Sequence, residues 1–335
     1  MALIDFVFTR AGTATRIDKN GVIQTVPANF PVVNFDDGDL LGYYSQRSVT
    51  NLLQRSEEFD NAYWTKTALN TTGTPPFVNV AVAPDGTTTA EKLIPNTVNT
   101  QHDFRRAGAT ATVTGNYTQS VYAKAGGRRF LQVGVGSAFA GFDLETGDKT
   151  AAAGGVSSKI EALPNGWYRC IVTIARTIGE SLSTIFIATS VLSNSGTGRA
   201  SLGNDSDGIF LWGAQLVEGS QPLSYIRTEA TAVTRPKDVA TASALTLSPL
   251  SNVQFKANFP TGYELVLAGL QATVSGYATI RLELSPTAKT LFVNGVEQDS
   301  DTGSYDWSGI TSIELGHFDG DEQPNFEIAD LRINE

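Results

Sequence analysis

Apolar and polar residues alternate along most of the chain, in short segments separated by Gly, Asn and Asp. The clearest segment is 279–285, where Ile280, Leu282 and Leu284 alternate with polar residues and are expected to point inward. The same alternation recurs in residues 117–125, 130–137, 183–191, 208–216, 312–318 and 326–333. Successive side chains of a β-strand point to opposite faces, so this spacing predicts strands with one buried face. No long stretch repeats apolar residues at the helical spacing.

Turn-forming residues separate these segments. Asn294-Gly295 lies between two strand-like halves, and this dipeptide is the strongest short signal for a hairpin with a type I′ turn. A second hairpin is expected around Asn20-Gly21. Short strands joined by frequent turns, with 32 glycines in the chain, are typical of antiparallel β-sandwiches. We therefore predict an all-β fold.

Changes of pattern along the chain divide it into four regions. Residues 1–50 are apolar but interrupted by prolines, and we expect an extended arm. Its apolar surface could pack against the sandwiches of its own chain or against neighbouring subunits and another protein, and we favour the second. Residues 51–232 carry the pattern of one sandwich, and residues 233–244 are small and polar, as in a linker. Residues 245–335 are expected to form a smaller C-terminal β unit.

Composition restricts the classes of partner. Only 17% of the 335 residues are charged, and the formal net charge is −10. The densest basic pairs are Arg105-Arg106 and Arg128-Arg129, which are too sparse for nucleic acid or for a basic membrane-surface helix. The first residues have neither a basic region nor a long apolar run, so we expect no signal peptide and synthesis in the cytoplasm.

Catalytic motifs are scarce. The chain has two histidines, His102 and His317, and one cysteine, Cys170, which alternation places on an apolar face. A zinc site of Cys and His is therefore not expected, whereas a Ser-His-Asp triad stays open because its members meet only in space. We predict that the protein is not an enzyme.

The stretch "NLLQRSEEFDNAYWTK", residues 51–66, combines acids with large aromatic residues. Glu57 and Glu58 are adjacent and point apart in either a strand or a helical turn, so they make a poor acid and base pair for glycoside hydrolysis. We expect Ser56 to cap a short turn that these acids favour electrostatically. Acidic segments at 36–39, 204–208, 299–306 and 318–322 could supply oxygen ligands for calcium, but turns of this composition are more often simply solvated.

The tryptophans divide by the faces they share. Trp212 alternates with apolar residues and is expected in the core, whereas Trp167 shares its face with Arg169 and is expected to be exposed. Trp64 follows a turn, and the pattern leaves both readings open. An exposed tryptophan on a sandwich would offer a flat face to a sugar ring.

Four segments, taken together, resemble a family. Residues 51–66, 83–93, 165–174 and 207–226 resemble a carbohydrate-binding-module-like β-sandwich found in bacteriophage tail-fibre, tail-spike and head-fibre proteins. The opening residues resemble the segment that precedes this sandwich, and the C-terminal strands look like half of a concanavalin-like (laminin-G-like) sandwich. The usual lead-in to the sandwich is reduced here to Gln46-Arg47 and residues 50–53.

This resemblance implies a jelly-roll or concanavalin-like sandwich in a fibre, spike or decoration subunit of a virion. Its implied partners are other virion proteins, further copies of the chain, with a trimer favoured, and a bacterial surface glycan. If the sandwich binds a glycan, we expect Tyr63, Trp64 and Trp167 to be the stacking residues. The resemblance also implies Glu57, Glu58 and Asp60 as ligands of a structural calcium ion. Two alternatives are a polysaccharide depolymerase and a purely structural capsid or tail protein.

Overall fold

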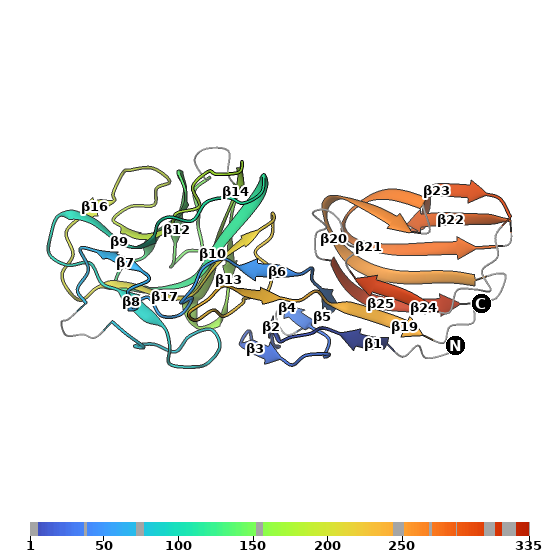
Figure 1. Cartoon of the computed structure of the whole chain (residues 1–335), viewed down its shortest axis with the longest axis horizontal. Helices are drawn as coiled ribbons and strands as arrows, with labels where there is room; N and C mark the ends of the chain where they lie inside the picture. Colours follow the sequence, from blue (N-terminus) through green and yellow to red (C-terminus); the bar gives the residue numbers. More distant parts are fainter. Residues whose placement is uncertain are drawn as a thin grey trace. The chain divides into compact units, whose positions relative to one another are not determined.

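The computed structural model describes residues 6–36, 39–71, 77–151, 157–243, 251–267, 270–285, 287–304, 312–316 and 326–334. Strands dominate these residues, which contain one short 3-10 turn, η1 (Pro164–Gly166), and no α-helix (Figure 1). The predicted all-β class is confirmed. The chain forms two compact units, one of residues 20–24 and 49–234 and the other of residues 1–19, 25–48 and 235–335. We call them the sandwich unit and the composite unit.

The sandwich unit is built from two antiparallel sheets. One has the strand order β13 (Ser157–Ala162), β14 (Trp167–Arg176), β10 (Gly115–Gly126), β17 (Gly208–Glu218) and β8 (Glu91–Leu93). The other has the order β12 (Ala138–Asp143), β11 (Phe130–Val135), β15 (Thr184–Thr189), β9 (Thr100–Arg106) and β16 (Ala200–Ser201), with β7 (Thr65–Thr67) also paired to β9. We refer to them as the β10 sheet and the β11 sheet. β6 (Val49–Asn51) pairs with β18 (Val233–Arg235), within which the boundary between the units falls.

The core of this unit lies between the two sheets. The β10 sheet contributes Tyr117, Val121, Ala123, Cys170, Val172, Ile174, Ile209, Leu211, Ala214 and Leu216, and the β11 sheet contributes Phe104, Leu131, Val133, Val135, Ala138, Ala140, Phe142, Phe186 and Ala188. Each large side chain removed from water contributes about 1.5–3 kcal/mol. Cys170 is a free, fully buried residue of this core, and burial raises the pKa of its thiol well above the usual value. A buried neutral thiol fits the expected apolar role.

A β-bulge in β17 changes the face on which one predicted core residue lies. Strict alternation places Trp212 with Ala214 and Leu216, which do lie in the core. Gly213 has a positive φ of 65°, and the register of β17 with β10 shifts beside it. Trp212 is buried, as predicted, but on the outer face, against Tyr122. The pattern could not predict this side because a bulge inserts a residue into the alternation.

Among the described residues, two sheets lie wholly in the composite unit. A seven-stranded sheet has the order β23 (Val296–Thr302), β22 (Ala288–Val293), β21 (Leu270–Leu284), β20 (Ser251–Leu267), β25 (Phe326–Asn334), β5 (Asp39–Ser45) and β4 (Val33–Asp36). A three-stranded sheet has the order β1 (Phe6–Thr9), β19 (Val239–Ser243) and β24 (Ser312–Gly316), and β2 (Ala14–Ile17) pairs with β3 (Ile23–Val26).

Two predicted hairpins are present. Asn294 and Gly295 join β22 to β23 with φ of 52° and 81°, as a type I′ turn requires. The β2–β3 pair encloses Asn20-Gly21, and residues 20–24 belong to the sandwich unit. The expected inward residues of β21, Ile280, Leu282 and Leu284, are all buried.

The N-terminal segment is not a free arm. β1 pairs with β19, and β5 pairs with β25, so strands near both ends of the chain share sheets. The expected separate arm, residues 1–50, is therefore wrong, and of the two predicted ways to pack its apolar surface, the structure shows the one within its own chain. Residues 233–244 are not a plain linker either, because β19 provides the middle strand of a sheet. The sandwich unit extends two residues beyond the predicted 51–232 at each end.

A buried charge cluster stabilises this arrangement. The Arg10 guanidinium donates to Asp238 Oδ1 at 2.8 Å, and Arg235 donates to Asp238 Oδ2. All three residues are at most 3% exposed. The backbone N–H of Gln46 also donates to Asp238, at 3.0 Å. Because each buried charge has partners, the cluster offsets its desolvation, and loss of one partner would leave an uncompensated charge.

Candidate functional site

The predicted acids Glu57, Glu58 and Asp60 lie with Tyr63 and Trp64 in one loop, residues 52–64, between β6 and β7, whereas Trp167 begins β14. Three successive backbone hydrogen bonds, from Glu58 to Arg55, Asn61 to Glu58 and Trp64 to Asn61, fold the loop into tight turns. The backbone N–H groups of residues 55 and 56 donate to carbonyl oxygens of residues 229 and 228. The loop is therefore attached to the segment that follows β17.

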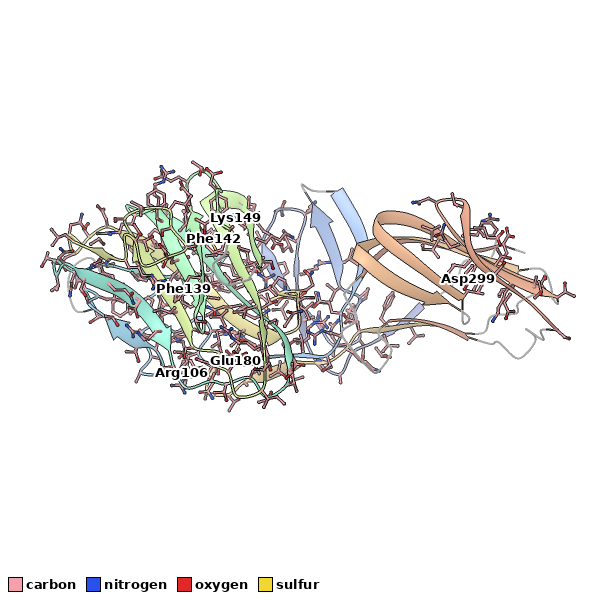
Figure 2. All side chains as sticks on the ribbon, turned by 90° about the horizontal axis from the view of Figure 1, so that it is seen from above. Arg106, Phe139, Phe142, Lys149, Glu180 and Asp299 are labelled. Atoms are coloured by element: carbon pink, nitrogen blue, oxygen red, sulfur yellow. The ribbon has the colours of Figure 1, made fainter. Side chains whose placement is uncertain are left out.

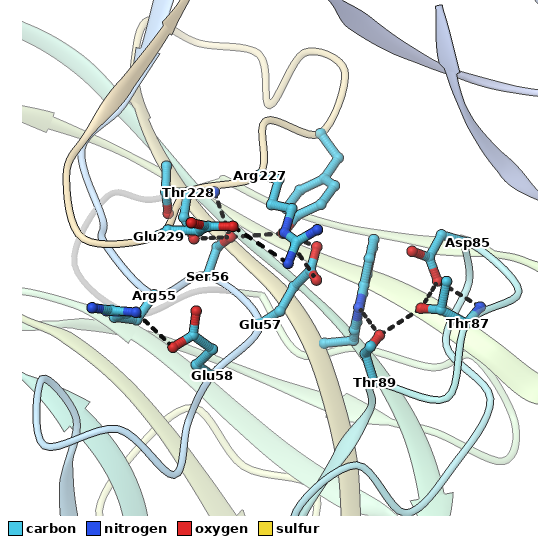
Figure 3. Close-up of polar contacts among 12 residues, drawn as sticks. Arg55, Ser56, Glu57, Glu58, Asp85, Thr87, Thr89, Arg227, Thr228 and Glu229 are labelled. Carbon is cyan, nitrogen blue, oxygen red and sulfur yellow. Dashed lines mark hydrogen bonds and ion pairs between the residues drawn. The ribbon is translucent and has the colours of Figure 1, made fainter.

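Ser56 and Glu57 form a buried polar clamp with Tyr225 and Thr228 (Figure 3). The Tyr225 hydroxyl donates to Glu57 Oε1 at 2.9 Å, so its oxygen is left to accept from Ser56 Oγ at 2.7 Å. Thr228 N–H donates to Ser56 Oγ at 2.8 Å. The Ser56 hydroxyl thus joins two distant segments, and the expected cap on its own turn is not what it makes.

Glu57 is shielded from water, and a hydrogen bond and a nearby positive charge compensate for its lost hydration. Burial raises the pKa of this carboxyl, and the Tyr225 hydrogen bond and the Arg227 guanidinium oppose the rise. Arg227 Nε lies 3.4 Å from Glu57 Oε2, and the Arg227 side chain is 60% exposed (Figure 3). Glu57 is 7% exposed, so its oxygens serve the clamp and are closed to a substrate.

A second polar chain in the same view positions Trp212. Thr87 donates to Asp85 Oδ1 at 2.7 Å, the hydroxyl oxygens of Thr87 and Thr89 lie 2.7 Å apart, and Trp212 Nε1 donates to Thr89 at 3.0 Å (Figure 3). Each hydroxyl passes on one hydrogen bond. The exposed turn at residues 85–87 thereby fixes the orientation of a buried indole.

The three predicted calcium ligands do not converge. Glu57 belongs to the clamp, and Glu58 accepts from Arg55 at 2.8 Å. Asp60 is exposed and interacts with Glu91. In the part of the chain that the structure describes, no three His, Cys, Asp or Glu side chains gather where a metal ion could be held. Glu57, Glu58 and Asp60 therefore give the calcium prediction no geometric support.

Asp60 instead lies next to a buried acid that the sequence reasoning missed. Glu91, on β8, is 1% exposed, and its Oε2 has no hydrogen-bond partner. Burial, together with the negative charge of Asp60, raises the pKa of Glu91 to about 9. Lys66 is also nearby, and its ammonium donates to the carbonyl oxygens of Asn61 and Trp64. Alternation with buried Leu93 was the available signal that Glu91 points inward.

The predicted glycan-stacking residues are not an exposed platform. Trp64 is 1% exposed and packs against Phe59 at 5.1 Å, and Trp167 is 3% exposed with its Nε1 donating to Val82 O at 3.1 Å. The expected exposure of Trp167 is wrong, because the segment that includes Val82 covers its face of the sheet. Tyr63 is half-buried, with the Arg106 guanidinium 4.4 Å from its ring centre. Buried rings offer no face to a sugar, so neither tryptophan supports the stacking prediction.

His102, the histidine that the structure describes, has a structural role. His102 is fully buried, and its two ring nitrogens lie 2.7 Å from the carbonyl oxygens of Ala68 and Ser201. With both nitrogens occupied by backbone groups, His102 cannot activate a serine. His317 and Trp307, and the acidic segment 318–322, lie outside the described residues.

Comparison with known proteins adds no family. The chain matches no protein-family model, and a search of curated proteins finds no match. Among the residues that the structure describes, no helix has the length and apolar character needed to cross a membrane.

Proposed function

We propose that this chain is a non-catalytic structural protein of a bacteriophage particle, a fibre, spike or decoration subunit, whose sandwich unit attaches to a bacterial surface glycan. The phage assignment rests on the resemblance of four segments to such proteins. Association with other virion proteins and with further copies of the chain, a trimer being favoured, is part of the same proposal.

The observation that carries the non-catalytic part is the clamp of Ser56, Glu57 and Tyr225. A glycosidase needs two accessible carboxyl groups on opposite sides of a bond. Here Glu57 is buried and bonded to Tyr225, and Glu58 is paired with Arg55. These acids stabilise the loop, which is the role expected in a binding or structural sandwich.

Gold-labelled antibodies against the recombinant chain would test the assignment on phage particles isolated from the source of the sequence. We expect electron micrographs to show label at fixed places on the head or tail. Label confined to cellular material would contradict the proposal. Peptides of this chain in the mass spectrum of gradient-purified particles provide the independent measurement.

One observation favours a depolymerase as the second candidate. Glu91, whose raised pKa keeps it protonated at neutral pH, lies beside the exposed Asp60, and a protonated carboxyl is what a general acid requires. Incubation with purified capsule and lipopolysaccharide would decide, with reducing ends as the readout. Release of oligosaccharides that is lost in Glu91→Gln would support this candidate, whereas the burial of Glu91 leads us to expect none.

A further inference from the structure

The outer face of the β11 sheet has a defined arrangement of side chains. Strand register aligns Asp103, Ile187 and Gln132 in one row across β9, β15 and β11. The neighbouring row contains Arg105 and Ile185, followed by Gly134 and Phe139 on β11 and β12. These residues alternate with core residues such as Phe104 and Phe186, so they point away from the core.

Two glycines on this face have no side chain, so other groups pack directly against their backbone. A Cβ at Gly134 would overlap the Phe139 ring, so the ring covers this glycine. A Cβ at Gly141 would overlap the backbone of Ser193, so the loop 190–199 lies against β12 at that point. Phe139 and Phe142 come from the same strand, and Phe142 belongs to the core while Phe139 stays half-buried outside it (Figure 2).

Arg199 is held on this surface in a fixed orientation. Its guanidinium lies 3.9 Å from the centre of the Phe139 ring, and its Nε donates to Gln132 Oε1 at 2.6 Å. Gln132 is fully buried and donates to the carbonyl oxygens of Ser193 and Ser195 at 2.6 and 2.8 Å. The ring therefore supports one face of the guanidinium, and a locked amide fixes its rotation.

The charge of Arg199 is not matched by a neighbouring acid. Arg105 on the same face is paired with Asp103 through two nitrogens, at 2.8 and 3.0 Å. For Arg199, by contrast, no ion pair is found within the described ranges, and its two terminal nitrogens donate no hydrogen bond there. Partial burial lowers the pKa of this guanidinium below its usual range. A bound anion would offset the hydration energy that this charge loses through burial.

We propose that Arg199, supported by Phe139 and Gln132, is a binding site for the carboxylate of an acidic saccharide. This inference rests on the proposed glycan-attachment function and names the class of glycan. The two free terminal nitrogens match the two oxygens of a carboxylate, and such bidentate pairs are among the stronger hydrogen bonds.

The surroundings fit a sugar. The loop 190–199 presents the exposed hydroxyl groups of Ser195 and Thr197 beside Arg199, and half-exposed Ile185 supplies apolar surface in the row of Phe139. The net charge of −10 repels anions at long range, so recognition depends on this local geometry rather than on steering. A single such contact gives affinity in the millimolar range, which repeated copies on a particle would multiply.

An arginine-selective nitrogen-15 spectrum of the full chain tests the site. The Nε resonance of Arg199 is assigned as the one lost in Arg199→Lys. Sodium glucuronate is titrated to about 100 mM at constant ionic strength, a range that covers millimolar affinity. We expect a saturable shift of this resonance with glucuronate and none with glucose. Binding followed on other resonances should be at least about tenfold weaker in Arg199→Gln and partly kept in Arg199→Lys.

Arg106→Gln is the matched control. Arg106 is exposed, carries the same charge and follows Arg105 on β9, but its guanidinium lies over Tyr63. Its loss should change glucuronate affinity less than about twofold. No saturable shift at Arg199, an equal loss in both variants, or tighter binding of inorganic phosphate than of glucuronate would overturn the inference. Particle labelling by antibodies is unaffected by these results, so the proposed function fails or stands separately.

Discussion

The two outer faces of the sandwich unit differ in how much of each is covered by other segments of the chain. On the β10 sheet, Trp212 and Tyr122 are covered by the segment after β17, with Tyr225 4.6 Å from Trp212. Arg169 and Gln215 on this face donate to the carbonyl oxygen of Pro222 in that segment. We call it the closed face. The outer face of the β11 sheet, the open face, keeps Arg105, Phe139 and Arg199 partly accessible.

The difference shows where stability and binding reside. Trp167, which also lies on the β10 sheet, was predicted from the sequence as an exposed sugar platform, yet it is buried and donates to the carbonyl oxygen of Val82. On the open face the guanidinium of Arg199 retains unused donors, although its sequence context, a Ser- and Gly-rich loop, gives no sign of a site. Substitutions on the closed face should therefore change unfolding, and those on the open face should change binding.

The largest effect is expected for Trp212→Ala on the closed face. Removing a buried indole that contacts Tyr122 and Tyr225 should lower the free energy of unfolding by about 3–5 kcal/mol. Urea denaturation of the full chain would measure the change. A loss below about 1 kcal/mol would mean that the aromatic cluster contributes little and that the closed face is not a second core.

A pH-dependent effect is expected at Glu91, which lies near Asp60. Its folded-state pKa of about 9 exceeds the ordinary 4.5, so the folded chain keeps a proton that the unfolded chain releases. The stabilisation is complete below about pH 4.5 and is lost as pH rises through about 9. Glu91→Gln should remove a difference of about 4 kcal/mol between about pH 5 and 8, since each pH unit between the two pKa values corresponds to about 1.4 kcal/mol.

Chemical denaturation of wild type and Glu91→Gln across that pH range would measure this slope. Glu145→Gln is the control, since Glu145 is exposed and pairs with Arg129 at the surface. Parallel curves for wild type and Glu91→Gln would show that Glu91 is ionised in the folded state.

A smaller loss is expected for Tyr225→Phe in the clamp. The variant keeps the ring against Trp212 but removes the hydroxyl that links Ser56 to Glu57. The free energy of unfolding should fall by about 2 kcal/mol, because buried polar groups lose a partner. Differential scanning calorimetry would show a lowered Tm, and Tyr168→Phe, at a half-buried tyrosine, is the comparison. Equal shifts in both would indicate that the clamp adds nothing specific.

The smallest effect on stability is expected on the open face. Arg199→Gln should lower the free energy of unfolding by about 1 kcal/mol or less, since it removes the hydrogen bond to Gln132 but no ion pair among the described residues. The same urea series would measure it. A loss as large as that of Trp212→Ala would mean that the stacked guanidinium is part of the fold, and the distinction between the faces would fail.

Strand content and hairpins could be predicted because they depend on local alternation and turn residues. Ile280, Leu282 and Leu284 are buried as the period predicts, and Asn294-Gly295 forms its turn. The side on which Trp212 lies could not be predicted. A strict alternation of faces does not include the extra residue that the bulge at Gly213 inserts.

The candidate site was harder to predict. Exposure of Trp167 was misjudged because its cover comes from residues about 85 positions away in the chain, around Val82. Arg199 was missed because its partners, Gln132 and Phe139, meet it only through the sheet and the loop 190–199. Such contacts depend on tertiary structure, which a single sequence does not reveal.

The Arg10–Asp238 ion pair joins residues 228 positions apart, and all of the sandwich residues 49–234 lie between them in the chain. During synthesis on the ribosome, Arg10 emerges long before its partner has been translated. The sandwich unit can complete its two sheets while the N-terminal strands still lack β19 and β25. We therefore expect an ordered maturation, in which the inserted unit can fold first and β1, the first strand made, pairs with its neighbour β19 late.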